Sequence, residues 1–509
     1  MNLIKSISTF SFFTIISRML GYLRDILIAV FLGTSFLADA FFIAFRIPNT
    51  FRRLFSEGTF NAAFIPSYSS EMLKGRTKSN KFASEVFSLL FLILLILVLL
   101  VQIFMPAFVS LIAPGFLGDD EKMQLIINLT RITFPFLLLI SLASFFSAIL
   151  NSHNKFAEAA AAPIILNIVL IIILLFSKFL NDNLVYYLSY AATFSGLLQL
   201  IFLYFFARKF LMLNFNLSFK ISKNVKIFFK KLIPSIFSSG VNQINILIGT
   251  ILASFQAGAV SYLYYADRIY QINLTIAGTA IGVVILPQLS KHIIEKKKKK
   301  IDLIQNKAIE LSLFLSLPAT IALVVGSNDI ISSLFGYGQF NELSVFNSAN
   351  ALHYFALGLP SFVLGRIFAS IFFANQDTKT PFYIGFMSVL FNILLSIYFL
   401  RSIGFIIIPM ATSISSWLST IALFFILKKR NLFNFNSIFI NRIFKIILSS
   451  LLMGLFFYYL LILFQHQLLF DQTFKSFYLI LSVIIAACFY VFVAYLIKAF
   501  QLKDIKLKY

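Results

Sequence analysis

The chain has 509 residues, of which 60% are hydrophobic and only 12% are charged. Soluble domains carry about 25% charged residues, so this composition excludes an ordinary soluble protein. Lipid-facing backbone must satisfy its own hydrogen bonds, and the apolar runs are too long for barrel strands. The sequence therefore predicts an all-α polytopic membrane protein.

Hydropathy predicts about 14 transmembrane helices, at roughly 20 residues per span. Lys5 precedes the first apolar run, but Arg18 and Arg24 interrupt it and no cleavage site of small residues follows. The first run is therefore interpreted as a retained span rather than a signal peptide. The predicted spans are 8–32, 34–56, 82–113, 126–150, 160–177, 185–207, 229–254, 258–288, 303–334, 346–373, 380–401, 404–427, 441–465 and 475–498.

The loops between these spans alternate in charge. One set is rich in lysine and arginine and includes the lysine run 296–300, whereas the other holds Asp119, Asp120, Glu121, Asp329 and Glu342. By the positive-inside rule the basic loops and both termini are cytoplasmic. The run 296–300 has an alternative interpretation as a patch that binds lipid or a partner. The net charge of +23 does not indicate nucleic-acid binding, because topology accounts for the basic loops.

The chain resembles itself at an offset near 222 residues. Arg46-Ile47 aligns with Arg268-Ile269, and FSAILNSHNK at 146–155 aligns with FASIFFANQDTK at 368–379. About 15 residues beyond each of the latter segments an asparagine, Asn167 or Asn392, lies inside an apolar span. The pattern predicts two pseudo-symmetric six-helix lobes, with the binding site between them. The predicted domains are 1–220 and 221–435 for the lobes and 436–509 for two additional helices.

Charged residues inside the first two spans indicate a polar chamber within the membrane. Such charges cost about 2.5–3.5 kcal/mol each on insertion scales, so they face protein or water rather than lipid. Asp39, Arg46 and Arg53 recur every seven residues, with Glu57 four further on, which is also the pattern of an internal salt-bridge network. The predicted charge network comprises Arg18, Asp25, Asp39, Arg46, Arg53, Glu57 and Asp267.

Three arginines are the candidates for contact with a ligand. Arg24 is expected to point about 100° away from Asp25, and Arg52 lies off the face that carries Arg46 and Arg53. Arg268 is adjacent to Asp267, so the two side chains are expected to diverge. A surplus of guanidinium groups suits a diphosphate, since arginine offers bidentate contacts to phosphate.

The sequence carries no catalytic constellation. There is no GxxxxGK[ST] loop, the four histidines are scattered, and a single cysteine, Cys488, excludes an intrachain disulfide and a multi-cysteine metal site. We therefore expect a transporter rather than an enzyme, without a cofactor or a metal site.

Long motifs then resemble a known family. SRMLGYLRD at 17–25, DAFFIAFRIPNTFRRLFSEG at 39–58, AFIP at 63–66 and ADRIYQ at 266–271 are similar to the signature of the MurJ/MviN lipid II flippases. The resemblance implies a flippase of the bacterial cytoplasmic membrane that carries undecaprenyl-diphosphate disaccharide pentapeptide to the outer leaflet. It also implies that Arg24, Arg52 and Arg268 bind the diphosphate, that the last two helices form a groove for the lipid tail, and that membrane lipids and the cell-wall synthesis machinery are partners.

One alternative stays open at this point. The chain could export small cationic solutes, or another lipid-linked oligosaccharide, within the same superfamily. The arginine surplus and the two additional helices both favour the lipid II flippase.

Overall fold

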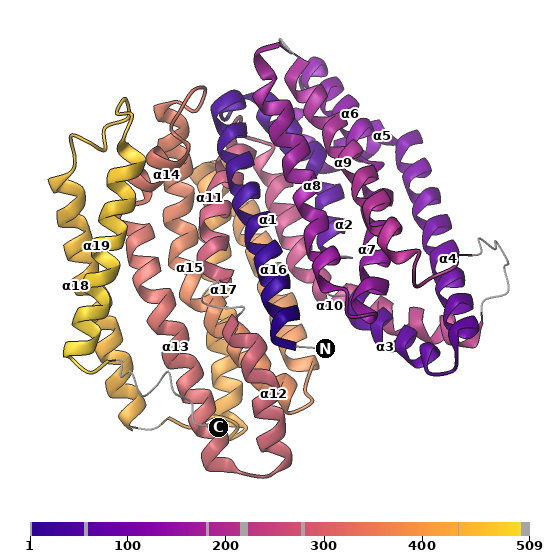
Figure 1. Cartoon of the computed structure of the whole chain (residues 1–509). Coiled ribbons are helices and arrows are strands. Elements are labelled where there is room, and N and C mark those ends of the chain that lie inside the picture. The colour runs from indigo at the N-terminus through magenta and orange to yellow at the C-terminus, as the bar shows by residue number, and fades with distance from the viewer. Residues whose placement is uncertain are drawn as a thin grey trace. The chain divides into compact units, whose positions relative to one another are not determined.

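The computed structural model describes residues 3–54, 60–179, 183–213, 222–275, 280–435 and 437–499, apart from some side chains inside helices. In this part of the chain every regular element is helical (Figure 1), which confirms the predicted fold class. By contact the chain divides into two compact units, Met1–Ser261 and Tyr262–Tyr509, and each is described by itself.

The helices of the first unit are α1 (Leu3–Leu32), α2 (Phe36–Leu54), α3 (Phe60–Met72), α4 (Arg76–Ile103), α5 (Met105–Ile112), α6 (Asp120–Thr133), α7 (Phe136–Ser152), α8 (Phe156–Leu175), α9 (Leu184–Ala207) and α10 (Lys223–Ala253). Helix α11 (Ala259–Leu274) begins in the first unit and continues into the second. The remaining helices are α12 (Ala280–Ile294), α13 (Lys298–Val325), α14 (Ser327–Phe335), α15 (Glu342–Ala374), α16 (Lys379–Ile403), α17 (Ile407–Lys429), α18 (Ser437–Leu463) and α19 (Lys475–Leu496).

Each predicted span coincides with one helix or with two consecutive helices. In the described part of the chain, nine helical stretches are long and apolar enough to cross a membrane by length and composition. Helices α1, α2 and α11, which carry the charged residues of the candidate site, are not among these nine stretches. The count of 14 spans therefore stays a prediction.

The predicted duplication is visible in the packing within each unit. Helix α7 packs on α9 and α8 on α9 in the first unit, as α15 packs on α17 and α16 on α17 in the second. Helix α10 packs on α2, α3, α4 and α5 and so belongs to the first compact unit. The predicted lobes, 1–220 and 221–435, are defined by the sequence repeat, whereas the two units are defined by compactness. The lobe boundary at 220/221 therefore stays a prediction.

Two local structures recur at the predicted offset. Asn154 and Gln376 both have positive φ, 60° and 61°, directly after a helix. In both turns the next N–H reaches five residues back, from Lys155 to the Leu150 carbonyl at 2.8 Å and from Asp377 to the Phe372 carbonyl at 3.0 Å. This is the hydrogen bond of a Schellman C-cap.

The helix N-caps also recur. Asp119 accepts from the Lys122 N–H at 3.1 Å at the start of α6, and Asn341 accepts from the Ser344 N–H at 2.9 Å at the start of α15. Capping side chains of this kind satisfy N–H groups that lack a partner inside the helix. The two repeats therefore share turns and caps as well as helices.

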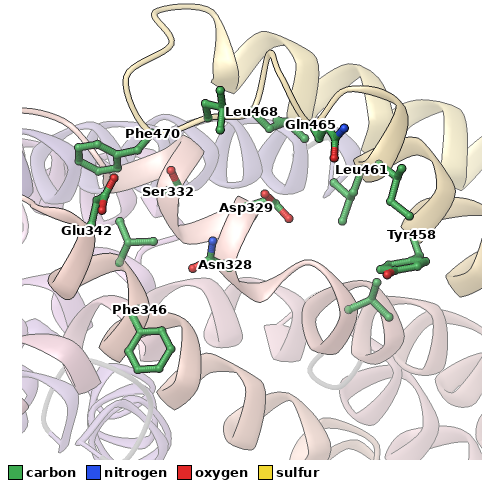
Figure 2. Close-up of a pocket in the computed structure, with 14 residues that line it drawn as sticks. Asn328, Asp329, Ser332, Glu342, Phe346, Tyr458, Leu461, Gln465, Leu468 and Phe470 are labelled. Carbon is green, nitrogen blue, oxygen red and sulfur yellow. The ribbon is translucent and has the colours of Figure 1, made fainter.

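The last two helices, α18 and α19, lie side by side (Figure 1) and pack on α13 and α14. Arg442 donates to Glu310 of α13 at 3.1 Å, and the Tyr490 hydroxyl donates to the Phe314 carbonyl at 2.8 Å. Between α18 and α14 lies a cavity of about 520 Å³ (Figure 2). The additional helices are thus attached to the second unit by polar contacts on α13.

Candidate functional site

The buried charges of α1 form one ion pair. Arg24 is 7% exposed and Asp25 only 2%. The Arg24 Nε lies 3.0 Å and its Nη2 2.7 Å from Asp25 Oδ1. The prediction that Arg24 points away from its neighbour is therefore wrong. The two Cα–Cβ bonds do diverge by about 100° on a helix, but the long arginine side chain folds back to reach the adjacent carboxylate.

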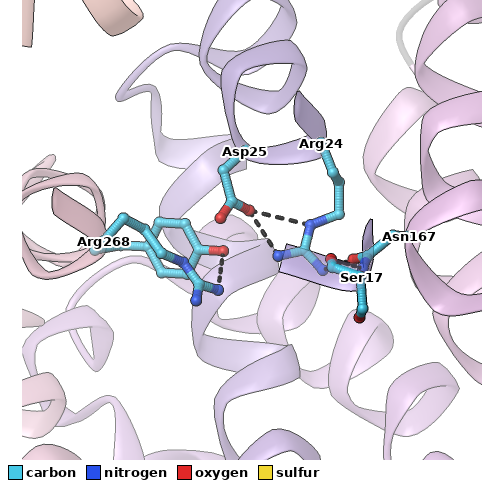
Figure 3. A network of polar contacts seen from close by, with 6 residues as sticks. Ser17, Arg24, Asp25, Asn167 and Arg268 are labelled. Carbon is cyan, nitrogen blue, oxygen red and sulfur yellow. Dashed lines mark hydrogen bonds and ion pairs between the residues drawn. The ribbon is translucent and has the colours of Figure 1, made fainter. Parts of the chain in front are cut away.

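A third contact joins this pair to α8. Arg24 Nη1 donates to Asn167 Oδ1 at 2.9 Å, and Asn167 Nδ2 donates to the Ser17 carbonyl of α1 at 2.9 Å (Figure 3). A Cβ added to Gly21 would meet Asn167 at 3.6 Å, so α1 and α8 lie close at this point. Sequence reasoning noted Asn167 only as a repeated position. Its signal as a site residue was a lone amide within an apolar span.

The arginine is not saturated by these contacts. A guanidinium group has five N–H donors, and the described contacts of Arg24 use three of them. Arg24 is thus held in place from two sides, and its other N–H groups make no hydrogen bond within the described part of the chain.

Asp39 of α2 is fully buried and binds the beginning of α11. Its carboxylate accepts from the Gly258 N–H at 2.8 Å, the Ser261 N–H at 2.8 Å and the Ser261 hydroxyl at 2.5 Å. Gly258 has a φ of +76°, which favours glycine, and directs its N–H to Asp39. All these contacts lie within the first unit.

Asp39, Arg46 and Arg53 recur every seven residues, and this spacing suggested an internal salt-bridge network. The contacts of Asp39 correct that interpretation for Asp39. In the described part of the chain its partners are neutral donors of one helix start rather than an arginine. A helix N-terminus stabilises a carboxylate, because its N–H groups lack partners inside the helix. Arg46 is partly buried on the same helix α2. Glu57 and the side chains of Arg52 and Arg53 lie outside the described residues.

Arg18, the remaining charge of α1, is exposed. In the parts of the chain that the structure describes, its side chain forms no hydrogen bond or ion pair. The structure therefore does not bring Arg18 into the Arg24–Asp25 contacts.

Arg268 and Asp267 contact different residues of α11, in the second unit. Arg268 Nη2 donates to the Tyr264 hydroxyl at 2.7 Å, and its guanidinium carbon lies 4.7 Å from the centre of that ring (Figure 3). Asp267 accepts a hydrogen bond from Gln271. Each partner is four residues away, as expected for side chains on one face of a helix.

A further arginine, Arg366 of α15, was missed by sequence reasoning. Tyr270 of α11 packs against Phe355 and Phe362 of α15, with ring centres 5.6 and 5.7 Å apart. Arg366 follows Phe362 by one helical turn on α15. The signal was a single arginine in the apolar stretch 346–373.

Comparison with known proteins identifies the family. The sequence model of the family described as "Lipid II flippase MurJ" matches residues 28–479. The chain is 39% identical over 419 residues to a protein of Rickettsia prowazekii named "Probable lipid II flippase MurJ", and the match covers 82% of both chains. The chain belongs to the MurJ family.

Solved structures agree with the assignment to the MurJ family. The structure of a "Lipid II flippase MurJ" in an inward closed conformation is 28% identical, with a TM-score of 0.81, covering 96% of this chain and 98% of that one. A multidrug resistance MATE family transporter in an inward-facing conformation is 16% identical with a TM-score of 0.65, covering 81% and 94% of the chains. The second likeness concerns the fold alone.

Proposed function

We propose that this chain is a lipid II flippase, which moves undecaprenyl-diphosphate disaccharide pentapeptide from the inner to the outer leaflet of the bacterial cytoplasmic membrane by alternating access. The observation that carries the proposal is the family match over residues 28–479. Export of cationic solutes is not favoured, because the likeness to a MATE transporter is limited to the fold.

The diphosphate is proposed to bind Arg24, Arg52 and Arg268. Arg24 supports this assignment because it is buried, fixed by Asp25 and Asn167, and retains unused N–H donors. Arg268 is oriented by the hydroxyl and ring of Tyr264. An anion held by arginines of both proposed lobes would draw the lobes together and thereby couple binding to a change of access.

The additional helices are proposed to hold the polyprenyl tail, as a third domain at 436–509. Large apolar side chains are exposed along both α18 and α19, as expected for surfaces that meet hydrocarbon. They include Phe444, Leu451, Leu455, Phe477, Ile484 and Phe492. The cell-wall synthesis machinery is a further proposed partner, since it would use the transported precursor.

The proposed topology places both termini and the lysine run 296–300 in the cytoplasm. Single cysteines introduced there into the Cys488→Ser protein should react with an impermeant thiol reagent only after the membrane is opened. Reaction in cells whose outer membrane has been removed but whose cytoplasmic membrane is intact would show that the proposed topology is wrong.

The function is tested by depleting the protein in its source bacterium and measuring lipid II in each leaflet. We expect outer-leaflet lipid II to fall while inner-leaflet lipid II accumulates. Unchanged outer-leaflet lipid II would contradict the proposal.

The diphosphate site is tested by Arg→Lys variants of the three arginines in the same assay. Lysine keeps the charge but loses the bidentate geometry, so each variant should restore transport only in part. Arg401→Lys is the matched control, because Arg401 is exposed at the end of α16. Full transport by all three variants would show that these arginines do not bind the diphosphate through bidentate contacts.

A further inference from the structure

Of the residues that the structure describes, no arginine lines the cavity between α14 and α18. It is an open cavity of about 520 Å³, lined by α14, the start of α15, the end of α18 and the connection between α18 and α19. All its lining residues belong to the second unit. Its polar lining comprises Asn328, Asp329, Ser332, Glu342 and Gln465, while Leu461 and Ile462 contribute to an apolar wall.

The charge of this cavity is purely acidic. Asp329 and Glu342 line it, and no lysine, arginine or histidine does. Figure 2 shows the Asp329 carboxylate between α14 and the end of α18. In the described part of the chain, neither carboxylate receives a hydrogen bond or ion pair from the side chain of another residue. Among the described residues, no basic side chain pairs with the negative charge of this cavity.

Comparison of the two repeats shows how the acidic and basic positions differ between them. At the offset of 222 residues, Asp120 corresponds to Glu342, but Lys122, which pairs with Asp119 at 2.8 Å, corresponds to the neutral Ser344. Ala107 corresponds to Asp329, whereas Asp119 and Glu121 correspond to the neutral Asn341 and Leu343, so the second repeat has no lysine here and one carboxylate fewer than the first. This change occurs in the repeat on which α18 and α19 pack.

The wall of the cavity is fixed by a buried lysine. Lys475, fully buried at the start of α19, donates to the Gly336 carbonyl at 2.6 Å and the Phe470 carbonyl at 2.5 Å. Its ammonium group also lies 4.4 Å from the ring centres of Tyr337 and Phe470. Phe470 lines the cavity, so these contacts hold the α18–α19 connection in place before any ligand binds.

We propose that this cavity binds the headgroup of an aminophospholipid. The primary ammonium would donate to Asp329 and Glu342, the phosphate would accept from the amides of Asn328 and Gln465, and an acyl chain would lie along Leu461 and Ile462. On the proposed topology the cavity is at the extracytoplasmic surface, where lipid headgroups lie. A divalent ion fits less well, because in the described part of the chain no three acidic, histidine or cysteine residues converge.

The test measures lipid retained by the purified full-length chain in native mass spectrometry. Phosphatidylethanolamine, phosphatidylcholine and phosphatidylglycerol are titrated separately. Phosphatidylcholine keeps the positive charge but has no N–H donor, so phosphatidylethanolamine should bind more tightly. Asp329→Asn should weaken its binding by about tenfold, as expected for loss of one charge-assisted hydrogen bond. Asp120→Asn, a change at the position of the first repeat that corresponds to Glu342, should leave binding unchanged.

Glu342→Gln provides a second variant, since the Glu342 side chain is exposed and the substitution should not disturb folding. Equal binding of the ethanolamine and choline lipids by the unaltered chain would overturn the proposal. An equal loss of lipid binding in Asp120→Asn would also overturn it. Displacement of the lipid by millimolar magnesium, with the ion itself bound to the chain, would overturn it as well. The assay contains no precursor, so its result does not depend on the proposed transport function.

Discussion

Arg24 of α1 donates to Asn167 of α8 at 2.9 Å, and Asn167 returns a hydrogen bond to the carbonyl of Ser17. Asn167→Ala should therefore loosen α1 from α8 and lower the unfolding free energy by about 1.5–3 kcal/mol, the range for hydrogen bonds to charged groups. Thermal unfolding in detergent measures the change. Asn392→Ala is the control from the second repeat, because Asn392 bonds to the hydroxyls of Thr412 and Ser396. An equal loss in both variants would show that the charge of Arg24 adds nothing.

The contact between Arg442 and Glu310 predicts how α18 is attached to α13. The side chains are 22% and 15% exposed and lie 3.1 Å apart, so solvent screens this pair only in part. Arg442→Ala should reduce transport and stability, with a coupling between the two residues of about 1 kcal/mol in a double-mutant cycle. The exchanged pair Arg442→Glu with Glu310→Arg should recover much of the loss. No recovery would mean that other contacts position α18.

Asp377, in the turn between α15 and α16, should make the unfolding free energy depend on pH in the acid range. Hydrogen bonds from Thr380, followed by the interaction with Arg430, lower the pKa of Asp377 from 3.8 to about 2. A group with a lowered pKa stabilises the fold above its unfolded pKa, and this stabilisation is lost as the pH falls through the folded pKa. The stability contributed by Asp377 should thus be complete above pH 3.8 and disappear by about pH 2.

Melting curves between pH 5 and pH 2 test this dependence, and Asp377→Asn should make stability less sensitive to acid in that window. Glu295→Gln is a second test of the same sign, since hydrogen bonds from Lys297 and His292 lower the pKa of Glu295 from 4.5 to about 2. An unchanged acid response in Asp377→Asn would contradict the assignment.

The helical architecture and its duplication could be predicted from the sequence because they depend on hydropathy and on repeated local patterns. The turns at Asn154 and Gln376 follow from such patterns, and both have the predicted offset. The partners of individual charges could not be predicted in this way. Helical spacing fixes the direction of a Cα–Cβ bond, but the arginine side chain is long enough to reach Asp25 from Arg24.

Asp39 shows the same limit of sequence reasoning for a second reason. Its partners, Gly258 and Ser261, lie more than 200 residues away in the chain and include backbone N–H groups, which carry no signal in the side-chain pattern. Lys475 is a further case, since its acceptors are two carbonyls. Arg366, by contrast, had a signal in the sequence that was overlooked.

The last prediction separates a structural from a transport role of Asp39. Asp39→Ala would leave the N–H groups of Gly258 and Ser261 buried without an acceptor, at a cost of about 1–3 kcal/mol for each group. We expect a marked loss of thermal stability in detergent together with loss of transport. Ser261→Ala removes only the hydroxyl and should cost about 1 kcal/mol. Asp119→Ala, which removes the exposed N-cap of α6, is the control and should have a smaller effect than Asp39→Ala. If Asp39→Ala abolished transport while the melting temperature stayed unchanged, the bonds to α11 would be irrelevant to stability, and Asp39 would act in transport through its charge.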